Sequence, residues 1–287
     1  MIKPDRIDRA HLRDPRDLSH TVHRSPAPPE LAGLVQWFWI PVWSVDPGRE
    51  AVQRVLQYPC ALIVITPDYA RFYGVTAGLS TTTLAGDGWA VGVTFEPAGG
   101  FLVAGRSIAQ FRDRHVDLDE VLDDVPTLVR DVRSAMTRPR LESSRAAAIT
   151  LLTDALRRFR PVDDEGLLIN EVVGYVENSP EVLRVAQVCE RFGVSERALQ
   201  RLVRRRVGLS PKWLIQRRRL HEASARLRDN PGTLADVAAD LGYADQPHFT
   251  RDFRSVTGLT PGEFAARYGT PSSFPPAERR PARSTST

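Results

Sequence analysis

One sequence pattern occurs twice in this chain. Residues 185–202 read VAQVCERFGVSERALQRL, and residues 234–253 read LADVAADLGYADQPHFTRDF. In each copy a small residue (Cys189 or Ala238) stands four positions before a glycine (Gly193 or Gly242), and a new amphipathic segment follows. Two helices that cross steeply need a small side chain at the crossing, and the tight turn between them needs a residue that tolerates positive φ. The pattern therefore predicts two helix-turn-helix units.

The second helix of each unit begins with a residue that suits a helix N-cap. Ser195 and Asp245 each offer a side-chain oxygen to the first turn. Pro247 falls within that first turn, where its missing N–H costs little. Leucine, valine and phenylalanine recur on one side of these segments and are expected to face the core. The polar positions left outside are Arg197, Gln200, Arg201 and Arg204 in the first copy, and Gln246, His248, Thr250 and Arg251 in the second.

The two copies also end alike, with VGLSP at residues 207–211 and TGLTP at residues 257–261. Gly208 and Gly258 suit a helix C-cap, and each following Ser-Pro or Thr-Pro pair suits an N-cap with proline at the first helical position. The first ending predicts a helix from Pro211 to about Arg228 that connects the units. A single helix–glycine–helix corner is easily imitated, but a repeat with matching ends is much more specific.

The basic charge is concentrated near the predicted connecting helix. The chain has a formal net charge of +4, yet residues 166–287 hold 19 Lys and Arg against 13 Asp and Glu, and residues 1–165 hold 20 against 22. From Arg197 to Arg228 there are 11 basic residues and a single acid, Glu222. A GC-rich genome explains the preference for arginine but not the clustering, and a solvated basic face is the simpler interpretation of such a run. Its position on the predicted units favours contact with a polyanion such as DNA.

Residues 167–268 resemble the DNA-binding domain of the AraC/XylS family of transcription regulators. The second copy and its ending, residues 242–261, are similar to the signature of that family. The resemblance implies seven helices, two helix-turn-helix units joined by a long helix, and binding to two successive major-groove segments of double-stranded DNA. It also implies contact with RNA polymerase, with activation and repression of transcription as open alternatives. Cys189, Pro247 and His248 depart from the residues usual in the family.

The resemblance assigns roles to the polar side chains of both units. The predicted base-reading residues are Arg197, Gln200, Arg201, Gln246, His248 and Arg251. Arginine pairs in a bidentate way with guanine, and glutamine pairs with adenine. Other basic residues are better placed to contact phosphate groups, which sets affinity without reading sequence. These predicted phosphate contacts are Arg204, Arg205, Arg206, Lys212, Arg217, Arg218 and Arg219.

The region from about Leu31 to Phe101 has a different composition: it is rich in β-branched and aromatic residues, with Gly and Pro between them. Short strands are expected at 52–57, 60–66, 69–75 and 89–95, with turn residues between them. Helices are expected at 101–109, 118–136 and 143–159. The fold class is therefore α+β: an antiparallel, β-rich, small barrel-like domain with helices, followed by an all-α DNA-binding domain.

The domain organisation follows from these elements. We expect a flexible tail at 1–25, a β-rich domain for sensing or dimerisation at 26–165, a DNA-binding domain at 167–268 and a disordered tail at 270–287. Within the DNA-binding domain, the two units are expected at about 182–206 and 233–256, with the connecting helix at 211–228. An apolar stripe at 149, 152, 156 and 159 is interpreted as packing against the sheet domain, with a dimer contact as the alternative.

The β-rich part is similar to a sensor domain found in a subset of these regulators. Aromatic residues gather there, and we expect some of them to line a ligand pocket, although packing in the sheet core is the simpler role for any single one. The candidate pocket residues are Trp37, Trp39, Tyr58, Phe72, Tyr73 and Trp89. The protein is expected to sense a small-molecule effector or to dimerise; the alternative is a dimeric regulator that acts without a ligand.

Other function classes receive little support. The chain has only two cysteines, and it contains no nucleophile elbow, phosphate-binding glycine loop or metal-ligand spacing, so no catalytic residue, cofactor or metal is expected. A fused enzyme and a protein–protein adaptor remain the rival hypotheses. There is no signal-peptide core and no apolar run of transmembrane length, so we expect a cytoplasmic protein without membrane contact, as a monomer or homodimer.

Overall fold

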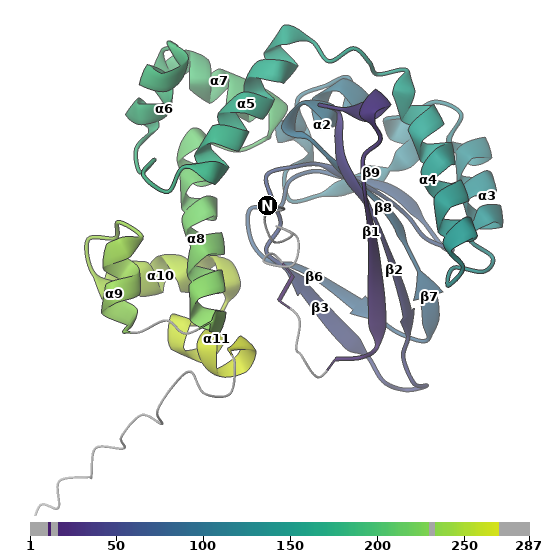
Figure 1. Ribbon diagram of the computed structural model, residues 1–287, viewed down its shortest axis with the longest axis horizontal. Helices are drawn as coiled ribbons and strands as arrows, with labels where there is room; N and C mark the ends of the chain where they lie inside the picture. The colour runs from purple at the N-terminus through teal and green to yellow at the C-terminus, as the bar shows by residue number, and fades with distance from the viewer. Residues whose placement is uncertain (1–10, 13–16, 230–232, 270–287) are drawn as a thin grey trace, which may run out of the picture. The chain divides into compact units, whose positions relative to one another are not determined.

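The computed structural model describes residues 11–12, 17–229 and 233–269 (Figure 1). These residues fall into two compact units, one ending at His221 and the other beginning at Glu222. The boundary lies within one helix, α8, at Pro211–Asp229. The predicted C-terminal tail at 270–287 and the first ten residues of the predicted N-terminal tail lie outside the described residues.

The first unit is built on antiparallel strands. A seven-stranded sheet has the order β1-β2-β8-β4-β5-β9, with β7 also paired to β2, and β3 and β6 form a separate two-stranded sheet. The strands are β1 at His20–Pro26, β2 at Val35–Ser44, β3 at Ala51–Val55, β4 at Leu62–Ile65, β5 at Ala70–Tyr73, β6 at Ser80–Leu84, β7 at Asp87–Trp89, β8 at Val91–Phe95 and β9 at His115–Asp117. The predicted antiparallel β-rich domain is confirmed.

Four strands, β1, β2, β6 and β9, lie outside the four segments in which strands were expected. β1 occupies residues that were expected in the flexible tail, so that prediction is wrong for positions 20–25. Its register runs from His20 opposite Trp43 to Pro26 opposite Trp37. The segment HTVHRSP is polar, and its strand conformation comes from pairing with the aromatic β2. The expected strand at 89–95 is divided at Ala90 into β7 and β8.

The long strand β2 has two different faces because successive side chains of a strand point in opposite directions. Phe38, Ile40 and Val42 are buried in the hydrophobic core. Trp37 and Trp39 alternate with them and lie on the other face, together with Trp43. The face with Phe38, Ile40 and Val42 therefore packs into the core. The opposite face, which we call the tryptophan face, carries Trp37, Trp39 and Trp43 and points away from that core.

Helices complete the first unit. They are η1 at Pro29–Leu31, α2 at Pro97–Ala104, η2 at Ile108–Phe111, η3 at Leu118–Glu120, α3 at Val125–Ala135 and α4 at Glu142–Arg157. In α4, Leu152 and Leu156 are fully buried, and Ile149 and Phe159 pack against the same core. The apolar stripe therefore packs within the chain, as its first interpretation predicted.

The C-terminal helices follow the repeated sequence pattern. They are α5 at Asp164–Asn178, α6 at Val185–Phe192, α7 at Glu196–Arg206, α8 at Pro211–Asp229, α9 at Leu234–Asp240, α10 at Gln246–Thr257 and α11 at Pro261–Tyr268. α5 to α7 belong to the first unit and α9 to α11 to the second. Between Asp164 and Tyr268 the described residues thus form the seven helices that the family resemblance implied.

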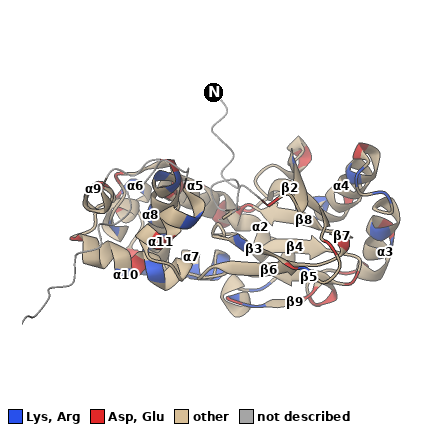
Figure 2. Ribbon diagram, turned by 90° about the horizontal axis from the view of Figure 1, so that it is seen from below, with Lys and Arg blue, Asp and Glu red and all other residues tan. Residues whose placement is uncertain are grey.

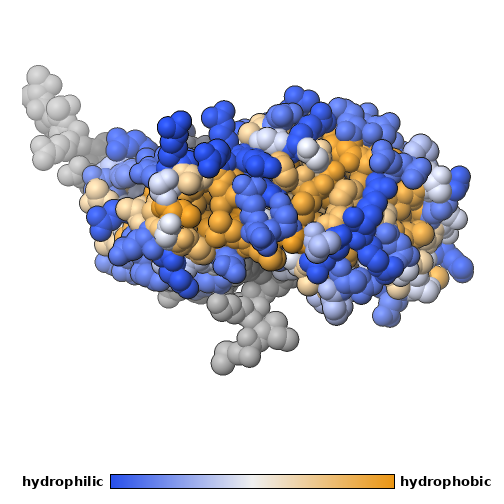
Figure 3. All heavy atoms as spheres, turned by 90° about the horizontal axis from the view of Figure 1, so that it is seen from above, coloured by the Kyte–Doolittle hydropathy of each residue, from blue (hydrophilic) through white to orange (hydrophobic). Residues whose placement is uncertain are grey.

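The described surface carries some exposed apolar side chains. Leu141, Leu167 and Leu183 are between 42% and 47% exposed. Figure 3 shows one face of the molecule, on which apolar residues in orange lie between polar side chains in blue. No helix among the described residues combines the length and apolar composition needed to cross a membrane.

Candidate nucleic-acid interface

The turn of the first helix-turn-helix unit has the predicted geometry. Gly193 ends α6 with a φ of +63°, and its N–H is bonded to the carbonyls of the last turn. Ser195 then caps α7, its Oγ accepting a hydrogen bond from the backbone N–H of Ala198 at 3.3 Å. Leu199 and Val203 are fully buried and hold α7 against the unit. The predicted cap and the predicted inward face are both confirmed.

The opposite side of α7 is a polar surface. Arg197, Gln200, Arg201 and Arg204 are all exposed. Their spacing of three, one and three residues places them on a single face of the helix. Gln200 donates a hydrogen bond from Nε2 to Oε1 of Glu196 at 3.0 Å, in the first turn of α7. The three side chains predicted to read bases in this unit therefore share one exposed face.

The second unit repeats this arrangement in α10. Asp245 caps the helix, its Oδ1 accepting from the backbone N–H of His248 at 2.6 Å, and Pro247 lies in the first turn as predicted. Gln246 and Arg251 are exposed. His248 is half-buried, and its ring meets Tyr243 edge-on at a centroid distance of 5.3 Å. His248 therefore has a packing role in addition to any contact with DNA.

The predicted phosphate contacts divide by exposure. Arg204 and Lys212 are exposed, and Arg219 is half-buried. Arg205 is exposed and forms an ion pair with Glu165 at 3.4 Å, and its guanidinium lies 4.5 Å from the centre of the Phe101 ring. Figure 2 marks the lysines and arginines in blue along the helices. Arg204, Arg205 and Lys212 therefore keep positions from which a phosphate group is accessible, whereas Nε and Nη2 of Arg219 are buried.

The prediction that Arg206 contacts DNA phosphate is wrong. Its side chain is buried, and its guanidinium donates to Oε2 of Glu165 from Nε at 3.0 Å and from Nη2 at 2.8 Å, and also to Asp163. The hydrogen bond from Arg206 holds the pKa of Asp163 below its usual value. Asp163 also caps α5 through the N–H of Gly166. Arg206 therefore joins the end of α7 to the start of α5 and is not available to DNA phosphate.

The predicted phosphate contacts of Arg217 and Arg218 are also wrong. Arg217 is buried and donates from Nη2 to the carbonyl oxygens of three successive residues, Thr76, Ala77 and Gly78, at 2.9 to 3.1 Å. Burial lowers the pKa of Arg217 to about 9. Arg218 is also buried and donates to the carbonyl oxygen of Val182 at 2.9 Å. These two side chains anchor α8 within the first unit.

The sequence did contain a signal for one of these corrections. Arg206 continues the spacing of Leu199 and Val203, at four and then three residues, so it lies on the buried stripe of α7. Arg217 and Arg218 had no comparable local signal, because their carbonyl partners are 36 to 141 residues away in the chain. Only the tertiary fold brings such pairs together.

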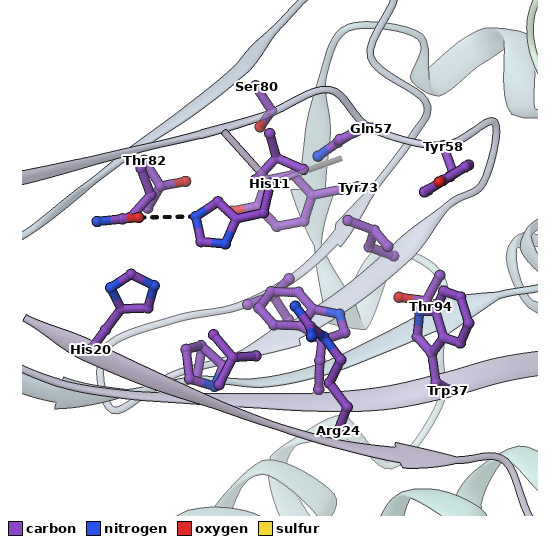
Figure 4. A pocket seen from close by; sticks show the side chains of 18 of the residues that line it. His11, His20, Arg24, Trp37, Gln57, Tyr58, Tyr73, Ser80, Thr82 and Thr94 are labelled. Carbon is purple, nitrogen blue, oxygen red and sulfur yellow. Dashed lines mark hydrogen bonds between the residues drawn. The ribbon is translucent and has the colours of Figure 1, made fainter. Parts of the chain in front are cut away.

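The tryptophan face of β2 borders a cavity of about 230 Å³ between the two sheets (Figure 4). Of the six candidate pocket residues, Trp37, Trp39, Tyr58 and Tyr73 line this cavity. Phe72 and Trp89 do not, because they lie in the hydrophobic core. The prediction that they line a pocket is therefore wrong, and alternation along the strand explains Phe72, which points away from its neighbour Tyr73.

Other lining residues were missed by the sequence analysis. His20 and Arg24 come from β1, which was expected to be a tail, and Gln53 comes from β3. Nε2 of His11 and Oε1 of Gln53 are 3.0 Å apart. The described residues contain no group of three or more His, Cys, Asp or Glu that could hold a metal ion.

Comparisons with known proteins match two separate parts of the chain. A family described as a helix-turn-helix domain matches residues 188–267, and a family described as a domain of unknown function (DUF6597) matches residues 23–117. The chain is 30% identical over 96 residues to the HTH-type transcriptional activator RhaS of Escherichia fergusonii, which covers 33% of this chain and 34% of that protein. It is 26% identical over 110 residues to the uncharacterized HTH-type transcriptional regulator YfiF of Bacillus subtilis, covering 38% of this chain and 35% of that protein.

The chain thus spans about a third of the length of the curated relatives that it matches. Among solved structures, ToxT from Vibrio cholerae O395 aligns with a TM-score of 0.38 at 12% identity, covering 87% of this chain and 97% of that one. The family match, the named relatives and the doubled, capped helix pairs agree with the resemblance drawn from the sequence. Residues 188–267 therefore form a helix-turn-helix domain of the AraC type.

Proposed function

We propose that this protein is a transcription regulator that binds a specific DNA sequence through α7 and α10. The observation that carries the proposal is the exposed polar face of α7, made by Arg197, Gln200, Arg201 and Arg204 on a helix whose other face is buried. The relatives named as HTH-type transcriptional activators support it. Contact with RNA polymerase and action in the cytoplasm are parts of the same proposal.

Each polar side chain has a role in this proposal. Arg197 and Arg201 donate bidentate hydrogen bonds to guanine, and Gln200 pairs with adenine. In α10, Gln246, His248 and Arg251 take the base-reading positions. The phosphate contacts are the predicted basic residues whose side chains stay exposed, namely Arg204, Arg205 and Lys212. These contacts set the affinity and its dependence on salt, whereas the base contacts select the sequence.

Selection from a random pool of double-stranded DNA tests the proposal. We expect the full chain to enrich a defined sequence, and its affinity to fall steeply as salt rises, because bound phosphate groups release counterions. Recovery of unenriched DNA, or an affinity that does not change with salt, would contradict it. The second outcome would favour the alternative of a protein–protein adaptor that uses this fold without DNA.

The first unit is proposed to sense a small molecule, and the cavity beneath β2 is the observation that favours this role. The alternative is a dimeric regulator that acts without a ligand. A thermal-shift screen of the full chain against small metabolites separates the two: a ligand that raises the midpoint of unfolding supports sensing. A screen without any shift, together with a dimer in solution, supports the ligand-independent regulator.

A further inference from the structure

Two of the tryptophans that line the cavity lie over glycines of neighbouring strands. Trp39 pairs with Gly92 across β2 and β8, and Trp43 pairs with Gly88 across β2 and β7. A Cβ added at Gly92 would lie 2.0 Å from Cε2 of Trp39, and one added at Gly88 would lie 2.3 Å from Cζ2 of Trp43. The two indole rings therefore rest on the backbone of the neighbouring strand, in space that any other residue would occupy.

Glycine inside a strand weakens it and often marks a place where another group approaches closely. Here the approaching group is an indole ring, and the result is an aromatic surface that faces the cavity. Tyr58 and Tyr73 add further rings to the wall (Figure 4). Aromatic rings prefer offset stacking or edge-to-face contacts with other rings, so this surface favours a flat, conjugated ligand over a puckered one.

Two buried polar atoms belong to side chains of this wall. Nε1 of Trp37 and Oε1 of Gln57 have no hydrogen-bond partner among the residues that the structure describes. One is a donor and the other an acceptor. A buried polar group without a partner costs free energy, and a ligand that supplies an acceptor and a donor recovers it. The wall is therefore complementary to a ligand that has at least one hydrogen-bond acceptor and at least one hydrogen-bond donor.

The charge of the wall excludes one ligand class. The described lining residues include the guanidinium of Arg24 and the imidazoles of His11 and His20, but no aspartate or glutamate. Tryptophan faces attract cations. The carboxylate of Asp17 is already paired with this wall, because it accepts a hydrogen bond from Gln53 and lies 3.6 Å from Nδ1 of His20. A cation in the cavity would therefore lie near Arg24 with no carboxylate among the described lining residues to balance it, and an uncompensated buried charge is costly. The wall is therefore suited to ligands without positive charge.

We infer that the cavity binds a flat, conjugated ring compound that carries a hydrogen-bond acceptor and donor and no positive charge. A cavity of about 150 Å³ holds a benzene molecule, so about 230 Å³ provides space for a ring with a polar substituent. This inference rests on the sensing role proposed for the first unit and specifies the chemistry that it senses.

Four small probes test the inference by calorimetric titration of the full chain. Benzamide is flat and neutral, benzoate is flat and negative, benzamidine is flat and positive, and cyclohexanecarboxamide is neutral but puckered. We expect benzamide to bind about tenfold more tightly than benzamidine and about fivefold more tightly than cyclohexanecarboxamide. Equal affinity for benzamide and either comparison probe, or no saturable binding of either benzamide or benzoate, would overturn the inference.

A pair of variants locates the binding site. Trp37→Phe keeps a ring in the wall but removes the indole donor, so we expect benzamide to bind about fivefold more weakly. Trp213→Phe is the matched control, because Trp213 lies on α8 and does not line the cavity. Equal effects of the two substitutions would place the probe elsewhere and overturn the assignment. DNA is absent from these titrations, so a chain that selects a DNA sequence but binds no probe contradicts this inference alone.

Discussion

Single arginines of α7 differ in what surrounds them, although the sequence shows them as one basic run. Arg201 is exposed on the polar face of the helix. Arg206 is buried, and its guanidinium is bonded to Asp163 and Glu165. An exposed arginine can contact DNA in place of water and contributes little to the free energy of unfolding. A buried, ion-paired arginine contributes to the free energy of unfolding directly. The two residues should therefore respond differently to the same substitution.

Arg201→Ala is expected to weaken binding to the selected DNA sequence by about 1–3 kcal/mol while leaving the free energy of unfolding almost unchanged. Arg206→Ala is expected to lower the free energy of unfolding by about 2–4 kcal/mol, somewhat less than for a fully buried pair because both carboxylates are partly exposed. Gel-shift titrations on selected and scrambled DNA, with urea denaturation of each variant, measure both effects. Equal losses on both DNA sequences for Arg201→Ala would contradict its base-reading role.

The carboxylate of Asp163 makes stability depend on pH. Because Arg206 lowers its pKa from 3.8 in the folded state, its contribution to stability is complete above pH 3.8 and disappears as pH falls through the lower, folded-state pKa. Asp163→Asn keeps a capping side chain for α5 but removes the charge. We expect the variant to be less stable than the original chain at neutral pH and the difference to shrink in acid.

Urea denaturation between neutral and acidic pH measures that difference. Asp154→Asn is the control, because Asp154 forms an exposed ion pair with Arg157 at 3.2 Å, and such pairs contribute little. A difference that stays constant across the whole pH range would show that the Asp163 carboxylate does not act through its charge.

At the scale of elements, α8 is held to the β-rich part of the first unit by one of its faces. Arg217 donates to three carbonyls between β5 and β6, and its guanidinium lies 4.5 Å from the centre of the Trp213 ring. Four residues further on, His221 stacks on Tyr58, with ring centroids 4.4 Å apart and planes within 6°. Tyr58 also lines the cavity, so the same side chain borders the proposed ligand site and the connecting helix.

Arg217→Met is expected to loosen this attachment. The methionine fills space but cannot donate to the three carbonyls, so amides in the first half of α8 should exchange with solvent deuterium at least several-fold faster. Lys212→Met is the matched control on the same helix, because Lys212 is exposed. Unchanged exchange in α8 of Arg217→Met would show that the hydrogen bonds to the carbonyls do not hold the helix.

For the whole molecule, the two polar helices belong to different compact units that share α8. If α7 and α10 read successive major-groove segments, Arg201→Ala and Arg251→Ala should relax the DNA preference at different positions, about one helical turn or 10 base pairs apart. Sequence selection with each variant measures the positions. Relaxation of the same base pairs by both variants would contradict reading by two separate helices.

The sequence alone was sufficient to predict the helices, turns and caps of the two helix-turn-helix units. Gly193, Ser195 and Asp245 act within four residues of their own position, so the turns, caps and buried faces of α7 and α10 follow from local geometry. The exposed face of α7 follows from the same periodicity. The family resemblance rests on this part of the chain, where local signals agree with one another.

Only the tertiary structure decided the remaining features. β1 is a strand because it pairs with β2. Arg217 and Arg218 are buried because carbonyl groups that are distant in the chain accept hydrogen bonds from their guanidinium groups. The aromatic side chains of the seven-stranded sheet that line the cavity are those on its tryptophan face. Strand register determines the face on which each side chain lies. These properties arise from contacts between residues far apart in the chain, and no local pattern in the sequence encodes them.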